Sequence, residues 1–160
     1  MNKITPYLFW VRVAMAVLLV AFVIVLQSGG KSSKTPIEEV SASVTAAVDM
    51  TKVQEGTNRL FKKYYGLSAS DYEGVALYTP VTNMDAEEIL IVKLKSNSQA
   101  DAVKAAVEKR LEKQKSSFEG YGIEQYDLLE KHLLDVRGNY VLYVVHPDAK
   151  AADQAFRDSL

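Results

Sequence analysis

The apolar run from Tyr7 to Leu26 is the feature that most constrains what this chain can fold into. All of its residues except Arg12 are apolar or aromatic. At the rise of an α-helix the run spans about 30 Å, which is the thickness of the hydrocarbon core of a bilayer. The sequence therefore predicts one membrane-spanning helix over residues 7–26.

A cleaved signal peptide is the alternative interpretation of the same run. Cleavable apolar segments have about 7 to 15 residues and end at a small-x-small site. Here the run continues to Leu26, and only Ser28, Gly29 and Gly30 follow as a poor substitute for such a site. The chain has no cysteine, which excludes a lipid-modified cysteine as the anchor. We expect the helix to be retained as a signal anchor.

The basic residues near the two ends of the run determine its expected orientation. Lys3 and Arg12 lie at the N-terminal end, and Lys31 and Lys34 follow the run. Arg12 can extend its guanidinium back to the N-terminal interface. We therefore predict a single-pass protein of the cell membrane, with residues 1–6 in the cytoplasm and the C-terminal part outside it. A cytoplasm-facing domain remains the alternative.

The rest of the chain is divided into a short linker and one domain. Residues 27–34 (QSGGKSSK) are small and polar, which predicts a flexible tether. Residues 35–160 suit a single extracytoplasmic domain with one core. The net charge is only −1, whereas nucleic-acid binding needs a concentrated basic face. We therefore expect no nucleic acid among the partners.

The periodicity of apolar residues predicts an α+β fold. Helical spacing covers 35–48, 57–65, 98–120, 123–131 and 148–160, and strand patterns cover 73–80, 87–95, 133–137 and 140–146. Gly138-Asn139 predicts a type II′ turn between the last two strands. This order predicts a largely antiparallel sheet of two hairpins packed on helices. The strand over 87–95 is apolar on both sides, which predicts a central position in the sheet.

Four segments carry a resemblance to a known family. They are YYGLSASDYEGVALYTP, NMDAEEILIVKLK, KSSFEGYGIEQYDLLEKH and VRGNYVLYVV, which together span nearly everything after the tether. They resemble the bacterial family called domain of unknown function 4358. The resemblance implies a small exported or membrane-anchored protein of Clostridia-type Gram-positive bacteria, without an established activity or catalytic residues. It also implies an accessory role in modifying surface polysaccharide, beside membrane O-acyltransferases.

Motifs for common enzyme chemistry are missing from the sequence. It has no Gly-x-Ser-x-Gly elbow and no thiol, and Gly30-Lys31-Ser32 lacks the rest of a phosphate-binding loop. His132 and His146 do not have the spacing of metal ligands, and we expect His146 to support a turn. We expect neither a cofactor nor a metal site.

An acidic stretch that precedes the central strand has an alternative as a cation site. Asp85, Glu87 and Glu88 offer oxygen ligands for a hard cation, but they lack the regular spacing of a calcium-binding loop. We expect a solvated acidic loop there.

The segment from Phe118 to Tyr126 (FEGYGIEQY) is the candidate binding site. Its two glycines around an aromatic residue permit a sharp backbone path. Its hydrogen-bonding and stacking side chains suit sugars or peptides, and they are Glu119, Tyr121, Glu124, Gln125 and Tyr126. The alternative is a purely structural turn at the end of a helix.

Two classes of function follow from these patterns. The first is a noncatalytic module that binds an envelope protein or a cell-surface polymer, through a sheet face or through this segment. The alternative is an envelope enzyme that acts on a glycan, with Glu119 and Glu124 as acid and base. An enzyme should have a concave pocket where one of these residues meets another carboxylate or His132. A binding module should have an exposed apolar or tyrosine-rich patch.

Overall fold

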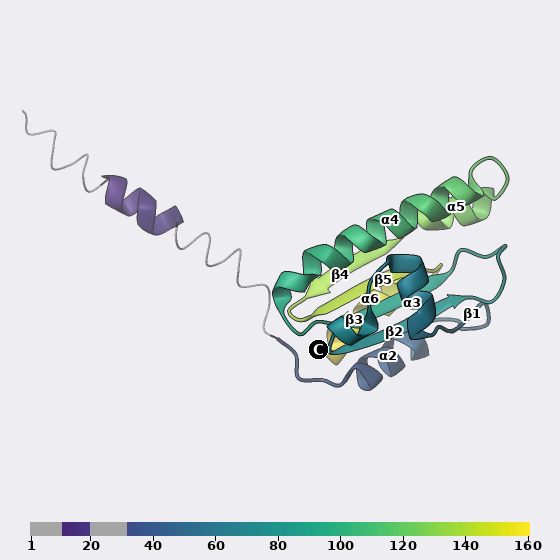
Figure 1. Ribbon diagram of the computed structural model, residues 1–160, viewed down its shortest axis with the longest axis horizontal. Helices are drawn as coiled ribbons and strands as arrows, with labels where there is room; N and C mark the ends of the chain where they lie inside the picture. Colours follow the sequence, from purple (N-terminus) through teal and green to yellow (C-terminus); the bar gives the residue numbers. More distant parts are fainter. Residues whose placement is uncertain (1–10, 20–31) are drawn as a thin grey trace, which may run out of the picture.

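A five-stranded sheet forms the centre of the domain in the computed structural model, which describes residues 11–19 and 32–160 (Figure 1). The strands are β1 (Val53–Glu55), β2 (Gly74–Pro80), β3 (Glu88–Lys93), β4 (Leu133–Arg137) and β5 (Tyr140–Val145). Their order is β1-β2-β3-β5-β4, and all neighbouring pairs are antiparallel. The predicted α+β fold with an antiparallel sheet is confirmed.

Helices cover both faces of this sheet (Figure 1). The helices of the domain are α2 (Ile37–Ala46), α3 (Asn58–Tyr65), α4 (Ala100–Phe118), α5 (Ile123–Glu130) and α6 (Ala149–Ser159). Helices α3, α4 and α5 lie on one face, and α2 and α6 lie on the other. Short 3-10 turns η1 (Ala69–Asp71) and η2 (Asn97–Gln99) precede β2 and α4.

Two apolar cores lie on opposite faces of the central strands. Leu90 and Tyr143 contribute to the core under α3 and α4, whereas Ile89 and Leu142 contribute to the core under α2 and α6. Every residue of β3 and β5 is buried, because successive side chains of a strand point to opposite faces and helices cover both faces here. The predicted central strand is confirmed. These two strands therefore expose no sheet face for the partner that we considered there.

Several element boundaries differ from the sequence prediction. Strand β1 was not predicted, because a three-residue edge strand is too short to show alternation. Helix α2 ends at Ala46, two residues before the predicted end. The capping box before α4 consists of Ser96 and Gln99, so the predicted start at Ser98 is wrong. The turn at Gly138 has a positive φ of 56°, and Asn139 does not, which confirms type II′.

The N-terminal prediction is only partly covered by the described residues. Residues 11–19 are helical and exposed, and the remainder of 7–26 lies outside the described residues, as do residues 1–6 and 27–31. Within 11–19 and 32–160, no helix is long and apolar enough to cross a membrane.

The two ends of the sheet have different roles in the fold. At one end the chain enters the domain, where Ser33 N donates to Asn139 Oδ1 at 2.8 Å and Tyr140 OH donates to the Thr35 carbonyl at 2.6 Å. Contacts with the domain therefore begin inside the predicted tether. The opposite end carries the loop 81–87 before β3 and the turn 119–122 between α4 and α5. We call this opposite end the tip.

Candidate functional site

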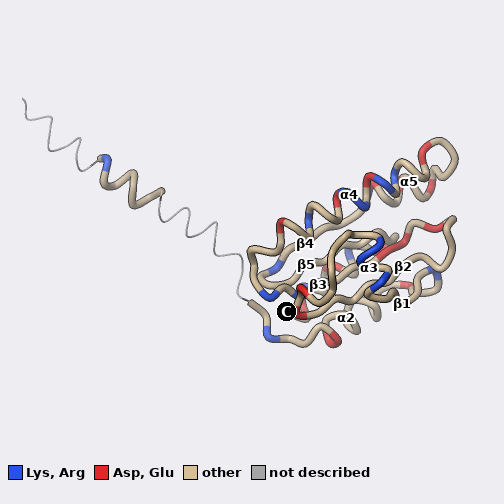
Figure 2. The backbone as a smooth tube through the Cα atoms, in the orientation of Figure 1, with Lys and Arg blue, Asp and Glu red and all other residues tan. Residues whose placement is uncertain are grey.

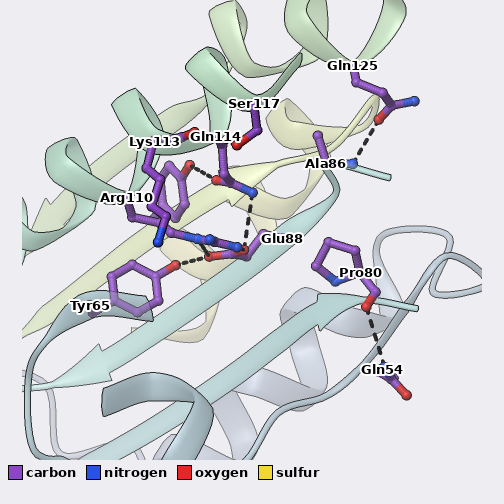
Figure 3. A network of polar contacts seen from close by, with 11 residues as sticks. Gln54, Tyr65, Pro80, Ala86, Glu88, Arg110, Lys113, Gln114, Ser117 and Gln125 are labelled. Carbon is purple, nitrogen blue, oxygen red and sulfur yellow. Dashed lines mark hydrogen bonds and ion pairs between the residues drawn. The ribbon is translucent and has the colours of Figure 1, made fainter. Parts of the chain in front are cut away.

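A cleft of about 290 Å³ opens between α4 and the loop that follows β2. It is lined by Tyr64, Pro80, Val81, Thr82, Asn83, Asp85, Arg110, Lys113, Gln114, Ser117 and Phe118. The four polar residues from α4 have the spacing i, i+3, i+4 and i+7, which brings them to one side of the helix. Figure 3 shows these side chains beside the strands. The cleft therefore has a polar wall on a helix that otherwise packs on an apolar core.

A fully buried carboxylate, Glu88, lies beneath the cleft. Arg110 Nη2 donates to Glu88 Oε2 at 2.6 Å, and Arg110 Nε donates to Oε1 at 3.2 Å. The Tyr65 hydroxyl donates to Oε1, and Gln114 Nε2 donates to Oε2 at 3.4 Å (Figure 3). Removing a charge from water costs several kcal/mol unless it is paired and hydrogen-bonded. Donors from α3 and α4 meet this requirement at the first residue of β3.

The Arg110 guanidinium is fixed by stacking as well as by charge. Its Cζ lies 4.0 Å from the centroid of the Tyr64 ring, and only 12% of its side chain is exposed. Burial, the largest influence, lowers the pKa of Arg110, but the hydrogen bonds and negative charge of Glu88 outweigh it and leave the pKa raised. Arg110 is therefore a rigid cation at the floor of the cleft.

The tyrosines of this network remain hydrogen-bond donors. Burial, reinforced by the charge of Glu88, raises the pKa of the Tyr65 phenol well above its ordinary value. Burial likewise raises the pKa of Tyr143, whose hydroxyl lies 3.5 Å from Gln114 Oε1. Both phenols therefore keep their protons at neutral pH.

The tip carries an exposed apolar cluster next to the cleft. Met84, Tyr121 and Ile123 are 63%, 65% and 74% exposed. Together with Phe118, Gly122, Glu124 and Gln125 they line a hollow of about 350 Å³, which we call the tip hollow. Large apolar side chains gathered on a surface indicate a binding site, whereas scattered ones do not.

The backbone of the tip explains the two glycines of the candidate segment. Gly120 has a φ of +86°, a conformation that L side chains rarely adopt. A Cβ at Gly122 would lie 2.6 Å from Phe118 Cδ1, so only glycine fits there without a shift. The ring centroids of Phe118 and Tyr121 lie 6.2 Å apart. The segment is thus a tight turn that also presents Tyr121 on the surface.

The other predicted site residues have different surroundings. Gln125 Oε1 accepts a hydrogen bond from the buried Ala86 N at 2.8 Å, so Gln125 joins the two segments of the tip. Tyr126 is half-buried against the core. Glu119 and Glu124 are exposed, and Figure 2 shows acidic residues in this turn. The candidate segment therefore divides into a surface part and a structural part.

A third hollow, of about 780 Å³, lies between α5 and the start of α6, and we call it the acidic hollow. Glu124, Asp127 and Asp148 are among its lining residues, together with Lys131 and Lys150, so Glu124 shares the hollow with two other carboxylates and two cations. Its histidine, His146, is held by hydrogen bonds from Asp148 N at 2.9 Å and to the Asp49 carbonyl at 3.0 Å. His146 thus supports the turn, as predicted. Neither Glu119 nor His132 lines any of these three hollows.

The prediction of a solvated acidic loop is wrong for Glu87 and Glu88. Glu87 is also buried, with Lys52 Nζ at 3.4 Å and His146 Nε2 at 3.5 Å from its carboxylate. Both carboxylates are covered because the strand that they begin is central. Within the described part of the chain, no group of three or more histidine, cysteine or acidic residues could hold a metal ion.

The Glu88–Arg110 floor was missed, although the sequence contains two signals for it. Glu88 continues the alternation of Leu90 and Val92 on one face of β3, which places it over the core. Gln114 continues the apolar stripe of α4. A polar residue in an apolar pattern indicates a buried polar contact. The sequence pattern does not identify the partner, because the partner lies on another element.

Comparison with known families matches residues 46–146 to the family described as Domain of unknown function (DUF4358). This match covers most of the chain, from the end of α2 to the end of β5. The chain belongs to the DUF4358 family. The matched residues include the cleft, the Glu88–Arg110 pair and the tip. No curated protein and no solved structure matches this DUF4358 chain. The type of bacterium that the resemblance implied stays a prediction.

Proposed function

We propose that this DUF4358 protein is a noncatalytic module, anchored in the cell membrane with its domain outside the cytoplasm, that binds another envelope protein through the tip. The observation that carries the proposal is the cluster of Met84, Tyr121 and Ile123 around the tip hollow. Aromatic residues and methionine are enriched at the centres of protein interfaces, where they fill pockets of the partner.

The charges around the cluster favour a protein partner with a complementary rim. Glu119, Glu124 and Asp127 are exposed near the apolar residues, and no ion pair forms between them and other described residues. Interfaces commonly combine an apolar centre with a polar rim of complementary potential. A partner with an apolar protrusion flanked by lysine or arginine therefore fits the tip.

The sequence and the exposed N-terminal helix support the membrane anchor. The run over 7–26 has the length of a spanning helix. Within it, Met15, Val17, Leu18 and Leu19 are each more than half exposed, and such side chains are stable in lipid. Because the chain enters the domain at the end opposite the tip, an anchored domain can present the tip away from the bilayer.

Site-specific photocrosslinking in intact cells tests the tip as the binding surface. A photoreactive residue at Tyr121 should give one defined crosslinked envelope protein, and the same residue at the exposed Gln154 of α6 should not. An additional Ile123→Ser change should abolish the product at unchanged protein level. Equal crosslinking from both positions, or retention on polysaccharide without any crosslinked protein, contradicts the proposed protein partner.

Protease added to intact cells tests the topology separately. The domain should be degraded in cells whose outer layers have been made permeable, while a cytoplasmic marker protein remains intact. Protection of the domain until the membrane is lysed would show that it faces the cytoplasm.

The acidic hollow favours a second candidate function, an envelope enzyme that acts on a glycan. Glu124, Asp127 and Asp148 offer carboxylates for an acid and a base on one concave surface. Incubation of the full-length chain with isolated cell-surface glycan should then release new reducing ends. This activity should disappear in Glu124→Gln and persist in Glu119→Gln, which changes an exposed carboxylate outside the hollow.

A further inference from the structure

We propose that the cleft between α4 and the loop after β2 binds a small monocarboxylate with hydroxyl groups, of the size of a sugar acid. This site is separate from the tip hollow, and the proposal does not depend on the protein partner proposed above. Four properties of the cleft support it, namely a rigid cation, free donors, a small excess of positive charge and a matching size.

The first property is that the cation at the floor is held in place before any ligand arrives. Glu88 binds Arg110 through Nε and Nη2, and the Tyr64 ring covers the guanidinium. Arg110 Nη1 makes no hydrogen bond with any described residue, and it is not fully buried. This nitrogen is free to donate to an oxygen in the cleft at little cost in side-chain entropy.

The second property is a set of additional donors around Arg110. Lys113 lies one turn further along α4, and its ammonium group has no hydrogen bond or ion pair with other described residues. Asn83 is exposed on the opposite wall, and its amide has no described partner either. Lys113 and Arg110 can therefore hold a carboxylate, while the Asn83 amide can donate to a further oxygen. The Thr82 hydroxyl already donates to Asp85 Oδ2, and the Ser117 hydroxyl already donates to the Lys113 carbonyl, so both can accept hydrogen bonds from ligand hydroxyls.

The third property is the charge balance of the cleft. Among the residues that line the cleft, Arg110 and Lys113 supply positive charge and Asp85 supplies negative charge, which leaves an excess of one positive charge. Outside the lining, the buried Glu88 and Lys63, whose Nζ lies 5.8 Å from the centroid of the Tyr64 ring, have opposite charges. An excess of one charge matches a carboxylate, whereas a phosphate dianion would leave one uncompensated negative charge in the cleft beside Asp85.

The fourth property is size. A volume of about 290 Å³ lies at the lower end of the range for small-molecule sites, so the cleft suits a single sugar-sized unit. Phe118 and Pro80 provide apolar contacts for the carbon skeleton on two sides. Polar groups that fix orientation beside a limited apolar wall are the usual composition of such sites.

Titration of the full-length chain in detergent micelles with sodium glucuronate, followed by NMR of backbone amides, tests the proposal. Saturable shifts should be confined to the loop 81–85 and to residues 110–118 of α4. Lys113→Gln should weaken binding by about tenfold, because it removes a charge-assisted hydrogen bond. Lys34→Gln, the matched control, removes an exposed charge at the opposite end of the domain, where the chain enters it, and should leave binding unchanged. Asn83→Ala should weaken binding by a smaller factor.

Three other outcomes would overturn the assignment. Glucose that binds as tightly as glucuronate would show that the carboxylate is not recognised. Inorganic phosphate that binds more tightly than glucuronate would contradict the charge balance. Folded protein without saturable shifts in the cleft would exclude the site. Since none of these readouts depends on a protein partner or on the exposed side chains of Tyr121 and Ile123, their failure and the failure of the proposed partner binding are distinguishable.

Discussion

The cleft and the tip are neighbours that share Phe118. The floor of the cleft and the tip nevertheless consist of opposite kinds of side chain. The floor consists of buried charges that satisfy one another across α3, β3 and α4, with Glu88 at its centre. The tip consists of apolar side chains, such as Met84 and Ile123, that no described residue covers. Each region thus contradicts the rule that apolar residues lie inside and charges outside.

The contrast separates residues that hold the domain together from residues that are free to bind. A substitution in the floor leaves a buried charge without its partner, which lowers the free energy of unfolding. A change in the exposed part of the tip removes few internal contacts and therefore alters recognition more than stability. Four predictions test this separation, in order of decreasing effect.

Removal of the Arg110 side chain should give the largest loss of stability. Arg110→Ala leaves Glu88 buried without its cation, and we expect the free energy of unfolding to fall by about 3–5 kcal/mol. Urea unfolding followed by circular dichroism measures this change. The control, Lys109→Ala, alters an exposed neighbour on α4 and should change stability by less than about 0.5 kcal/mol. Equal effects of the two changes would contradict the role of the floor.

Replacement of Gln125, which joins the two segments of the tip, should have an intermediate effect on stability. Gln125→Ala removes the acceptor for the buried Ala86 N, and an unpaired buried donor costs about 1–3 kcal/mol. Hydrogen exchange of the Ala86 amide should become faster as well. Glu124→Ala, its exposed neighbour, should leave both quantities unchanged, and protection of Ala86 in Gln125→Ala would show that another group replaces the amide.

High pH should weaken the floor through its tyrosines. The pKa of Tyr65 is raised in the folded state, so its contribution to stability is complete below the unfolded value of about 10 and is lost as the pH rises towards the folded value. Each such tyrosine adds a slope of about 1.4 kcal/mol per pH unit above pH 10. Tyr65→Phe should reduce the slope without abolishing it, because Tyr143 shares the shift. An unchanged slope in Tyr65→Phe would rule out this contribution.

The exposed residues of the tip should give the smallest effect on folding. Tyr121→Ala combined with Glu124→Ala should change the free energy of unfolding by no more than about 0.5 kcal/mol. Thermal unfolding measures this, and crosslinking of the partner from a photoreactive residue placed at Met84 should be lost in the double variant. If the pair instead causes unfolding, the segment is a structural turn and the contrast between the two regions fails.

The sequence predicted the local elements well because each depends on neighbouring residues. The stripe of Val103, Val107 and Leu111 was sufficient for α4, and Gly138 was sufficient for the hairpin turn. The Glu88–Arg110 pair joins residues 22 positions apart, and no periodicity specifies which charges meet. The floor therefore required the tertiary structure, whereas the glycines around Tyr121 already indicated a sharp turn of the backbone.

The domain's attachment at Ser33, opposite the tip, has a mechanical consequence. The strands run between these two ends, since Lys93 pairs with Tyr140 near the attachment and Glu88 pairs with Val145 near the tip. With the membrane anchor and the tip partner proposed above, tension between the two would act along the strands, across ladder hydrogen bonds that lie perpendicular to it. Many of these bonds would then carry the load together, so the domain is built to resist pulling in the direction in which a bound partner would pull.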